Sequence, residues 1–269
     1  MNSKDISPII EGWEYKPYEL SVRKIVGSDG KEKVQLRLDL GLLQMEVSGR
    51  PDGKRPFGRE SLLEYYLDLI EEHKAKYGTD ESFKLNGEDC SRLRQEGIQY
   101  YHRYLSFFQL EDYEGAERDT ARNLRVFDLI RKYAADEKDV LALEQFRPYD
   151  IMMNARALAA IDLARKEYDR ALGHIQEGIT KIKSFYEDGG QRELFESSWE
   201  VNLLKDISRE VESSKPPTLK DKLEKQLNAA VEKEDYEEAA RIRDELQKMM
   251  DAEIEEGIRR IGMEGNGEV

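Results

Sequence analysis

One stretch, from Phe57 to Lys215, limits most strongly what this chain can fold into. It contains a single proline, Pro148, and it is rich in Glu, Lys, Arg, Leu and Ala. Proline breaks a helix interior, whereas these five abundant residues all favour helix. The stretch therefore predicts a body that is almost entirely helical, and a mainly α fold for the chain.

A short signature recurs within this stretch. A charged turn precedes Tyr113, and Ala116 follows three positions later; the same order recurs at Tyr168 and Ala171. Positions i and i+3 share one face of a helix, so the tyrosine can wedge between two antiparallel helices where the alanine lets their backbones approach. The signature predicts helical hairpins whose second helices begin at these tyrosines.

The second of these hairpins, Ala155–Asp188, resembles a tetratricopeptide (TPR) repeat. Its first helix carries Leu158-Ala159, and its second carries Tyr168, Ala171, Ile175 and Gly178. The resemblance implies a TPR-like array of antiparallel helical hairpins, which we place at residues 61–212.

The first hairpin, from Tyr100 to Tyr133, departs from this pattern. Tyr104 and Asn123 stand where small residues are expected. Its signature also lies 55 residues before the next one, against a regular repeat of about 34 residues. An extra helix near Asp139 to Phe146, closed by Pro148, would account for the difference.

Two runs of alternating apolar residues precede the helical body. Tyr18 to Val26 and Lys33 to Leu40 lie on either side of a Gly-Ser-Asp-Gly turn at residues 27–30. Alternation around such a turn predicts a β-hairpin. Met45 and Val47 can extend it as a third short strand, and so small a ribbon has to pack on the helix that follows.

A basic loop joins this ribbon to the helices, within residues 1–60. In a chain of net charge −14 it carries four basic side chains, Arg50, Lys54, Arg55 and Arg59. Two interpretations stay open. The loop contacts an anion or an acidic partner, or it is a solvated connector whose arginines pair with nearby acidic helices.

Start signals divide the helical region further. Ser61 with Glu64 predicts a capping box that opens a helix. A later helix is expected over Gln191 to Glu212, where apolar residues recur on one side. Together with the hairpins, these helices make up the expected body at 61–212.

A proline-rich linker at residues 213–218 is expected to separate the body from the C-terminal segment. Pro216-Pro217 ends any helix that reaches it. Thr218 with Asp221 can cap the helix that follows. We expect a helical hairpin at 219–256 and a flexible tail at 257–269.

The C-terminal segment repeats the tyrosine and alanine signature and adds to it. Two short helices fold back on each other around Glu234-Asp235, and Tyr236 and Ala239 take the signature positions. Here alone the signature continues with Ala240 and then with Arg243-Asp244.

This segment resembles the UVR motif, the helical hairpin found in the excision-repair helicase UvrB and its nuclease partner UvrC. The likeness runs without a gap from Leu223 to Leu246, although Tyr236 stands where Phe is usual and Glu234 where an apolar residue is common. The resemblance implies pairing with another UVR hairpin, either in a second copy of this chain or in a different protein. The candidate partner-binding residues are Leu223, Leu227, Ala230, Tyr236, Ala239, Ala240, Arg243, Asp244 and Leu246.

Composition excludes several other kinds of function. The net charge of −14 argues against a generic nucleic-acid surface, and the one cysteine excludes an intrachain disulfide or a cysteine-cluster zinc site. The three histidines lie on separate expected helices. We therefore predict no catalytic residue, metal site or cofactor. With no apolar run of membrane-spanning length and no signal peptide, a cytoplasmic location is expected.

Two functional hypotheses follow from these patterns. The first is a non-enzymatic bacterial adaptor that binds another UVR hairpin, with a link to excision repair or stress response. The alternative is a DNA-repair accessory that contacts nucleic acid through the loop at 50–59, although the acidic charge makes direct binding unfavourable.

Overall fold

The computed structural model describes residues 5–217 and 219–264, without the side chains of residues 220, 221, 250 and 252–264. The chain forms two compact units, Met1–Ser213 and Ser214–Val269. Helices account for 67% of the structure, so the expected mainly α fold is confirmed.

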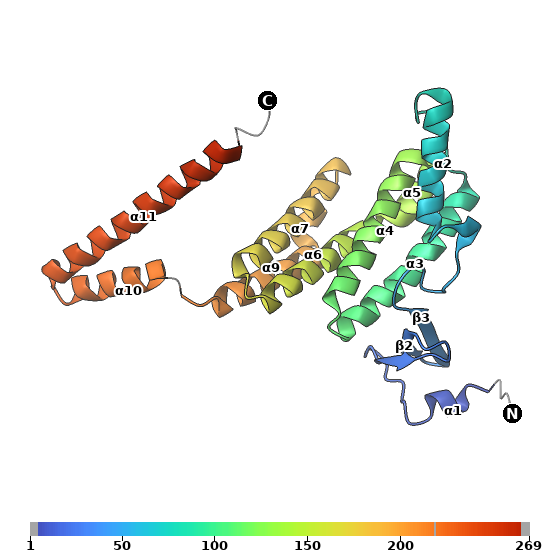
Figure 1. Cartoon of the computed structure of the whole chain (residues 1–269), viewed down its shortest axis with the longest axis horizontal. Helices are drawn as coiled ribbons and strands as arrows, with labels where there is room; N and C mark the ends of the chain where they lie inside the picture. Colours follow the sequence, from blue (N-terminus) through green and yellow to red (C-terminus); the bar gives the residue numbers. More distant parts are fainter. Residues whose placement is uncertain (1–4, 218, 265–269) are drawn as a thin grey trace. The chain divides into compact units, whose positions relative to one another are not determined.

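The first unit is built from helices that pack side by side. Figure 1 shows α3, α4, α6, α7 and α9 following one another in a row. The expectation of an almost continuous helical stretch up to Lys215 is confirmed. The helices are α2 (Leu62–Tyr77), α3 (Gly87–Gln109), α4 (Tyr113–Tyr133), α5 (Glu137–Glu144), α6 (Arg147–Ala164), α7 (Tyr168–Asp188), α8 (Arg192–Ser197) and α9 (Trp199–Ser214).

The expected β-hairpin is present, together with the third strand. An antiparallel sheet of order β1-β2-β3 follows the short helix α1 (Ser7–Ile10), and the 3-10 turn η1 (Pro56–Gly58) precedes α2. The second strand ends earlier than expected, because Asp39 and Leu40 form the turn into β3 and Leu40 is 90% exposed there. The strands are β1 (Val22–Val26), β2 (Glu32–Leu38) and β3 (Gly41–Glu46).

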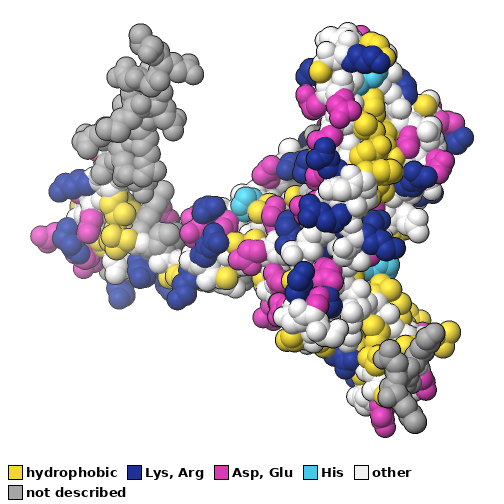
Figure 2. All heavy atoms as spheres, turned by 45° about the vertical axis from the view of Figure 1, so that its right-hand side comes forward, with side chains coloured by type: hydrophobic (Ala, Val, Ile, Leu, Met, Phe, Trp, Pro, Cys, Tyr) yellow, Lys and Arg dark blue, Asp and Glu magenta, His cyan; other side chains and the backbone are white. Residues whose placement is uncertain are grey.

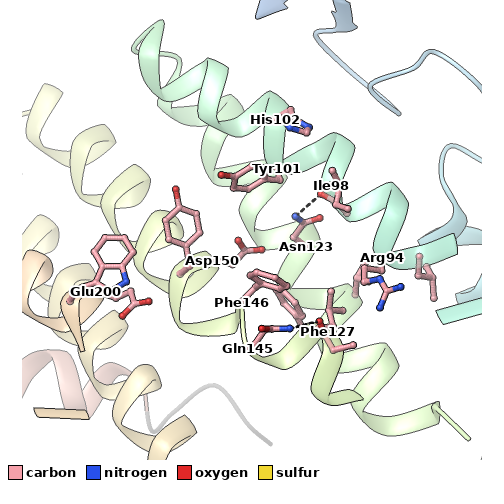
Figure 3. A pocket seen from close by; sticks show the side chains of 17 residues that line it. Arg94, Ile98, Tyr101, His102, Asn123, Phe127, Gln145, Phe146, Asp150 and Glu200 are labelled. Carbon is pink, nitrogen blue, oxygen red and sulfur yellow. Dashed lines mark hydrogen bonds between the residues drawn. The ribbon is translucent and has the colours of Figure 1, made fainter. Parts of the chain in front are cut away.

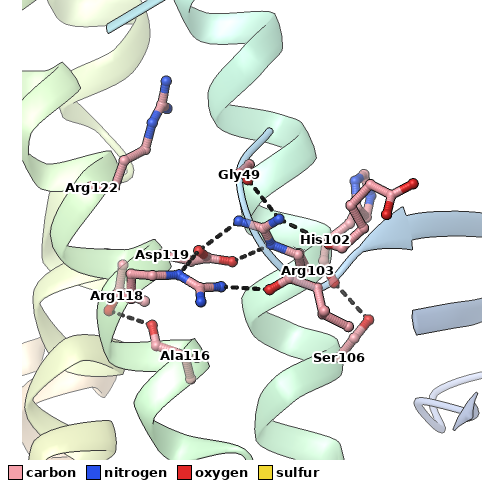
Figure 4. Close-up of polar contacts among 12 residues, drawn as sticks. Gly49, His102, Arg103, Ser106, Ala116, Arg118, Asp119 and Arg122 are labelled. Carbon is pink, nitrogen blue, oxygen red and sulfur yellow. Dashed lines mark hydrogen bonds and ion pairs between the residues drawn. The ribbon is translucent and has the colours of Figure 1, made fainter. Parts of the chain in front are cut away.

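The sheet packs on α3, and not on α2, the helix that follows it directly. Val34 on β2 is fully buried in the same apolar core as Phe107 on α3. Arg103, 1% exposed, holds Asp119 of α4 through two bonds of 2.6 and 2.8 Å. It also donates to the carbonyl oxygens of Glu46 and Gly49, as Figure 4 shows for Gly49. One buried guanidinium therefore ties the end of the sheet to two helices.

The start of α2 differs from the expected capping box. Ser61 is the N-cap residue, but its hydroxyl donates to the Glu64 carboxylate and does not cap the backbone. The free Leu62 N–H instead donates to the fully buried Glu96 carboxylate at 2.9 Å. A carboxylate from α3 thus takes the place that the sequence assigned to a local side chain.

The hairpin turns at the tyrosine signatures share one geometry. Glu111, Lys166 and Glu234 precede the three second helices, and all adopt left-handed backbone, with φ of 57°, 62° and 60°. In each turn the next residue donates its N–H to a carbonyl five positions back, at 2.9 Å. This is the pattern of a Schellman helix ending. The expected helical hairpins are confirmed at all three signatures.

Two predicted helix boundaries are wrong. Pro148 does not close α5; it lies in the first turn of α6, where proline lacks only an N–H that would have no helical partner anyway. The helix expected over Gln191 to Glu212 is broken at Ser198, whose backbone is extended. The Ser198 hydroxyl accepts from the Val201 N–H at 3.3 Å and so caps α9.

Small residues allow close packing in one hairpin and are replaced in the other. A Cβ on Gly178 would lie 2.6 Å from the Ala155 Cβ, so α6 and α7 meet closely there. In the first hairpin Asn123 donates to the Gly97 carbonyl at 3.1 Å, and Tyr104 is fully buried with its hydroxyl on Asp150 at 2.6 Å. The hydrogen bond from Asn123 thus joins α4 to α3 within this hairpin, whereas that from Tyr104 joins α3 to α6.

The second unit is the C-terminal hairpin of α10 (Leu219–Glu232) and α11 (Tyr236–Glu264). Helix α11 runs past residue 256, where we expected the hairpin to end, because no proline interrupts the sequence there. The expected cap at Thr218 and Asp221 lies outside the described residues, as does the part of the expected tail at 265–269.

Candidate functional site

The C-terminal hairpin closes around a small core of its own. Leu223 on α10 packs with Ile242 and Leu246 on α11, and these three side chains are 5%, 1% and 9% exposed. Leu227 and Met249 cover them in part. So few buried side chains stabilise the hairpin only weakly by comparison with a full domain core.

Helical spacing divides the nine candidate residues into two faces. Five of them recur on the inner side and make or flank the hairpin core: Leu223, Leu227, Ala230, Ala239 and Leu246. The other four, Tyr236, Ala240, Arg243 and Asp244, share the outer face of α11 and are exposed. The inner five therefore pack within one hairpin, and their role in binding a partner stays a prediction.

The outer face carries an aromatic ring and a pair of opposite charges. Tyr236 is 69% exposed. The Arg243 guanidinium lies 3.9 Å from the Asp244 carboxylate, and both side chains are about 70% exposed. A pair at this distance in water holds each group only loosely, so both can bind a group on a partner.

The stronger pairs of the hairpin lie elsewhere. Arg241 donates to Glu238, three positions earlier on α11, at 2.6 and 2.8 Å. This contact holds the pKa of the Glu238 carboxyl below its ordinary value. Because both groups are at the surface, the pair supports the helix without fixing a partner.

The basic loop is partly neutralised by its own protein. Arg50 lies 2.9 Å from the buried Glu96 carboxylate and 3.1 Å from Asp52. Arg59 pairs with Asp68 on α2 at 2.6 Å. In Figure 2, basic and acidic side chains are interspersed over the visible face. Arg50 and Arg59 thus pair with acidic neighbours, as the second interpretation of the loop predicts. Lys54 and Arg55 alone give only weak support for a nucleic-acid surface.

A hollow that the sequence did not predict lies between α3, α4, α5, α6 and α9. Its volume is about 820 Å³. Figure 3 shows Tyr101, Phe146 and Asp150 converging on it. Ile98, Tyr101, Phe146 and Trp199 line it with exposures from 37% to 54%, which is high for such large apolar side chains.

A buried carboxylate forms part of the wall of this hollow. Asp150 is 3% exposed and accepts a hydrogen bond from the Tyr104 hydroxyl. Burial raises its pKa to about 6, against the opposing effect of its hydrogen bonds. The hydrogen bond holds the carboxylate in place.

A second, smaller hollow of about 450 Å³ adjoins the first, because Tyr149 lines both. Its walls are Leu105 and Phe108 of α3, Met153 and Arg156 of α6, and Ile207 of α9. No single segment signals either hollow, since the side chains come from several helices that are separate in the sequence. Only the regular recurrence of aromatic residues on α3 could have suggested one.

The remaining titratable candidates occupy separate structural positions. His73 bonds Ser82, and His174 lies 3.2 Å from Asp162. Burial lowers the pKa of His102 and raises that of the Cys90 thiol to about 11, which keeps the thiol protonated and unreactive. Among the described residues no cluster of three potential metal ligands occurs, and no helix has the length and apolar character of a membrane span.

Comparison with known families identifies the C-terminal hairpin. The model of the UvrB/uvrC motif (UVR) matches residues 218–249, which confirms the resemblance seen in the sequence. No curated protein and no solved structure matches the chain. The likeness of the helical body to TPR repeats therefore stays a prediction.

Proposed function

We propose that this chain, whose C-terminal hairpin is a UvrB/uvrC motif, is a non-enzymatic interaction protein that binds a second hairpin of the same type. The second hairpin belongs to another copy of the chain or to a different protein. The motif favours a bacterial partner from excision repair or stress response. A cytoplasmic location, without cofactor, belongs to the same proposal.

The observation that carries this proposal is the division of the matched hairpin into two faces. Among the described side chains, its inner face holds one cluster of three buried residues flanked by two buried alanines, so a single hairpin gains little from its own core. Its outer face presents Tyr236 beside Arg243 and Asp244. Aromatic and arginine side chains are the ones that most often supply binding energy at protein interfaces.

Arg243 and Asp244 are well suited to a symmetric pair. In a twofold dimer, the arginine of one copy can meet the aspartate of the other, and the reverse contact follows from symmetry. Two such charge-assisted contacts select one register of the hairpins, because a shifted register brings like charges together.

Charge exchange in the full-length protein tests the self-pairing form. Arg243→Asp alone and Asp244→Arg alone should each weaken self-association about tenfold or more, measured by sedimentation equilibrium. An equimolar mixture of the two variants should recover it, because each faces opposite charges in the mixed dimer. Equal association of the wild type, both variants and their mixture would rule out this interface.

A monomeric wild type at about 100 μM would assign the hairpin to a different partner. Tagged full-length protein should then recover a UVR-bearing protein from lysate, identified by mass spectrometry. Tyr236→Asp should lose it, whereas Arg192→Gln, a matched exposed change in the helical body, should keep it. If Tyr236→Asp recovers as much of the UVR-bearing protein as the wild type does, the role proposed for the hairpin is contradicted.

A further inference from the structure

The second hollow holds an arginine that lacks a counter-ion. In the part of the chain that the structure describes, no carboxylate pairs with Arg156. Its guanidinium lies 5.2 Å from the centre of the Phe108 ring and 3.4 Å from the Met153 sulfur. Burial lowers its pKa, which is the direction expected when surrounding apolar groups strip water from a cation.

The three most deeply buried arginines of the same unit each hold a carboxylate, unlike Arg156, which is half-buried. Arg103 holds Asp119, Arg122 holds Glu96 and Arg147 holds Glu144. In a chain with 57 acidic and 43 basic residues, carboxylates are plentiful. A half-buried arginine that meets none of them, on the wall of a hollow, is suited to an anionic group from outside the chain.

The apolar residues beside it form one groove with the larger hollow. On α3, Ile98, Tyr101, Leu105 and Phe108 recur every three or four residues and so share a face. The face of α6 that bears Arg156 lies opposite, and Trp199 and Ile207 of α9 flank it. From residue 94 to residue 109, α3 spans about 22 Å at 1.5 Å per residue, which equals the length of about fifteen residues of helix.

The chemistry of these walls favours a helical occupant over an extended one. An extended peptide needs partners for its backbone N–H and C=O groups, and the walls are mostly aromatic and aliphatic. A helix satisfies its own backbone and can present large apolar side chains to the groove.

We infer that this groove binds an amphipathic helix of a partner protein, with large apolar side chains against Tyr101 and Trp199 and one Asp or Glu on Arg156. The proposed pairing of hairpins does not require it. The carboxylate restores the missing counter-ion of Arg156, and its bidentate geometry matches the guanidinium. The groove thereby selects acidic amphipathic helices over basic ones.

A displayed library of helical fifteen-residue peptides, selected on the full-length protein, tests this inference. Enriched peptides should carry three or four apolar residues on one face and an Asp or Glu beside them. One enriched peptide is then synthesised with its acidic residue kept, or changed to Gln or Lys. In a Trp13→Phe background, Trp199 is the sole tryptophan and its emission should shift to shorter wavelength on binding.

Variants separate the role of Arg156 from a structural effect. Arg156→Gln should weaken the acidic peptide about tenfold and remove its advantage over the Gln peptide, whereas Arg156→Lys should retain part of that advantage. Arg125 is an exposed arginine on α4. Arg125→Gln should change neither the affinity for the acidic peptide nor its advantage over the Gln peptide. Thermal unfolding should show that every variant is folded.

Three outcomes would overturn the inference. One is an enriched set of peptides that shows no preference for Asp or Glu beside the apolar face. Another is the same preference in Arg156→Gln as in the wild type. The third is a Trp199 emission that shifts with protein concentration in the absence of peptide, which would place a second copy of this chain in the groove.

Discussion

At the scale of the residue, buried ion pairs position the parts of the first unit. Glu96 caps α2 and meets both Arg50 and Arg122, while Arg103 joins α3 to α4 and to the sheet. Buried charges cost free energy unless every hydrogen-bonding group finds a partner. Although the chain is acidic overall, the packing of its first unit depends on a small set of buried basic residues.

Loss of Arg103 should be the most damaging single change among these. Arg103→Met leaves the buried Asp119 carboxylate with only the partly exposed Arg118, and it leaves two carbonyl oxygens without their donor. Breaking a buried pair in this way costs about 3–5 kcal/mol. Urea unfolding should show this loss, whereas Arg125→Gln should change stability by less than about 0.5 kcal/mol. Similar losses in both would contradict the role assigned to Arg103.

Asp150 predicts a specific pH dependence. Its pKa is raised from 3.8 in the unfolded chain to about 6 by burial. Between these values the folded state holds a proton that the unfolded state has released, so the contribution of Asp150 to the unfolding free energy falls as pH rises from 4 to 6. Asp150→Asn should remove this slope and gain about 3 kcal/mol at pH 7.5, by the usual 1.36 kcal/mol per pKa unit. Chemical unfolding at a series of pH values tests this, and an unchanged slope would contradict it.

At the scale of the element, the three helical hairpins share a turn but differ in how their helices pack. Each turn uses a left-handed residue that is not glycine. The hairpin of α6 and α7 then closes through small residues, whereas that of α3 and α4 closes through polar contacts, from Asn123 to the Gly97 carbonyl and from Arg103 to Asp119. One local signal therefore supports two kinds of interhelical contact.

Gly178 should be intolerant of even one added carbon. Gly178→Ala places a Cβ 2.6 Å from the Ala155 Cβ, so α6 and α7 have to move apart at a cost of about 1–3 kcal/mol. Gly173→Ala, on the same helix, meets nothing within 4 Å and should stabilise by about 0.5–1 kcal/mol. Thermal unfolding of the pair checks this, and two changes of the same sign would refute it.

Local signals made the helices, turns and strands predictable, because each depends on nearby residues. The tyrosine signatures located all three hairpin turns, and alternation located the sheet. Pro148 was misassigned because proline both ends helices and begins them, and the break at Ser198 depends on a side-chain hydroxyl. The groove was not predictable, since Tyr101, Tyr149 and Trp199 meet only through tertiary packing.

At the scale of the whole molecule, the two units differ greatly in the size of their cores. The first unit buries two large apolar clusters, whereas the described part of the hairpin holds one cluster of three buried side chains. Stability grows with buried apolar surface, so the hairpin should unfold before the body. A partner that binds the folded hairpin should therefore raise the stability of the hairpin.

Self-pairing should make the first unfolding transition depend on protein concentration. Each tenfold rise in concentration adds about 1.4 kcal/mol to a dimer. Circular dichroism from about 2 to 200 μM should show the early helical loss moving to higher temperature, while the later transition stays fixed. Arg243→Asp should remove the movement. A first transition independent of concentration would leave only a different protein as the hairpin's partner.

The bond from Arg103 to the Glu46 carbonyl also bears on how the chain acquires its fold. It joins residues 57 positions apart, whereas each helical hairpin pairs segments that adjoin in sequence. Closing a long loop loses more chain entropy than closing a short one, and structures with mainly local contacts form faster. We therefore expect the helices to pair first and the sheet to dock last. In refolding experiments, protection of the amides of β2 should lag behind that of α6 and α7.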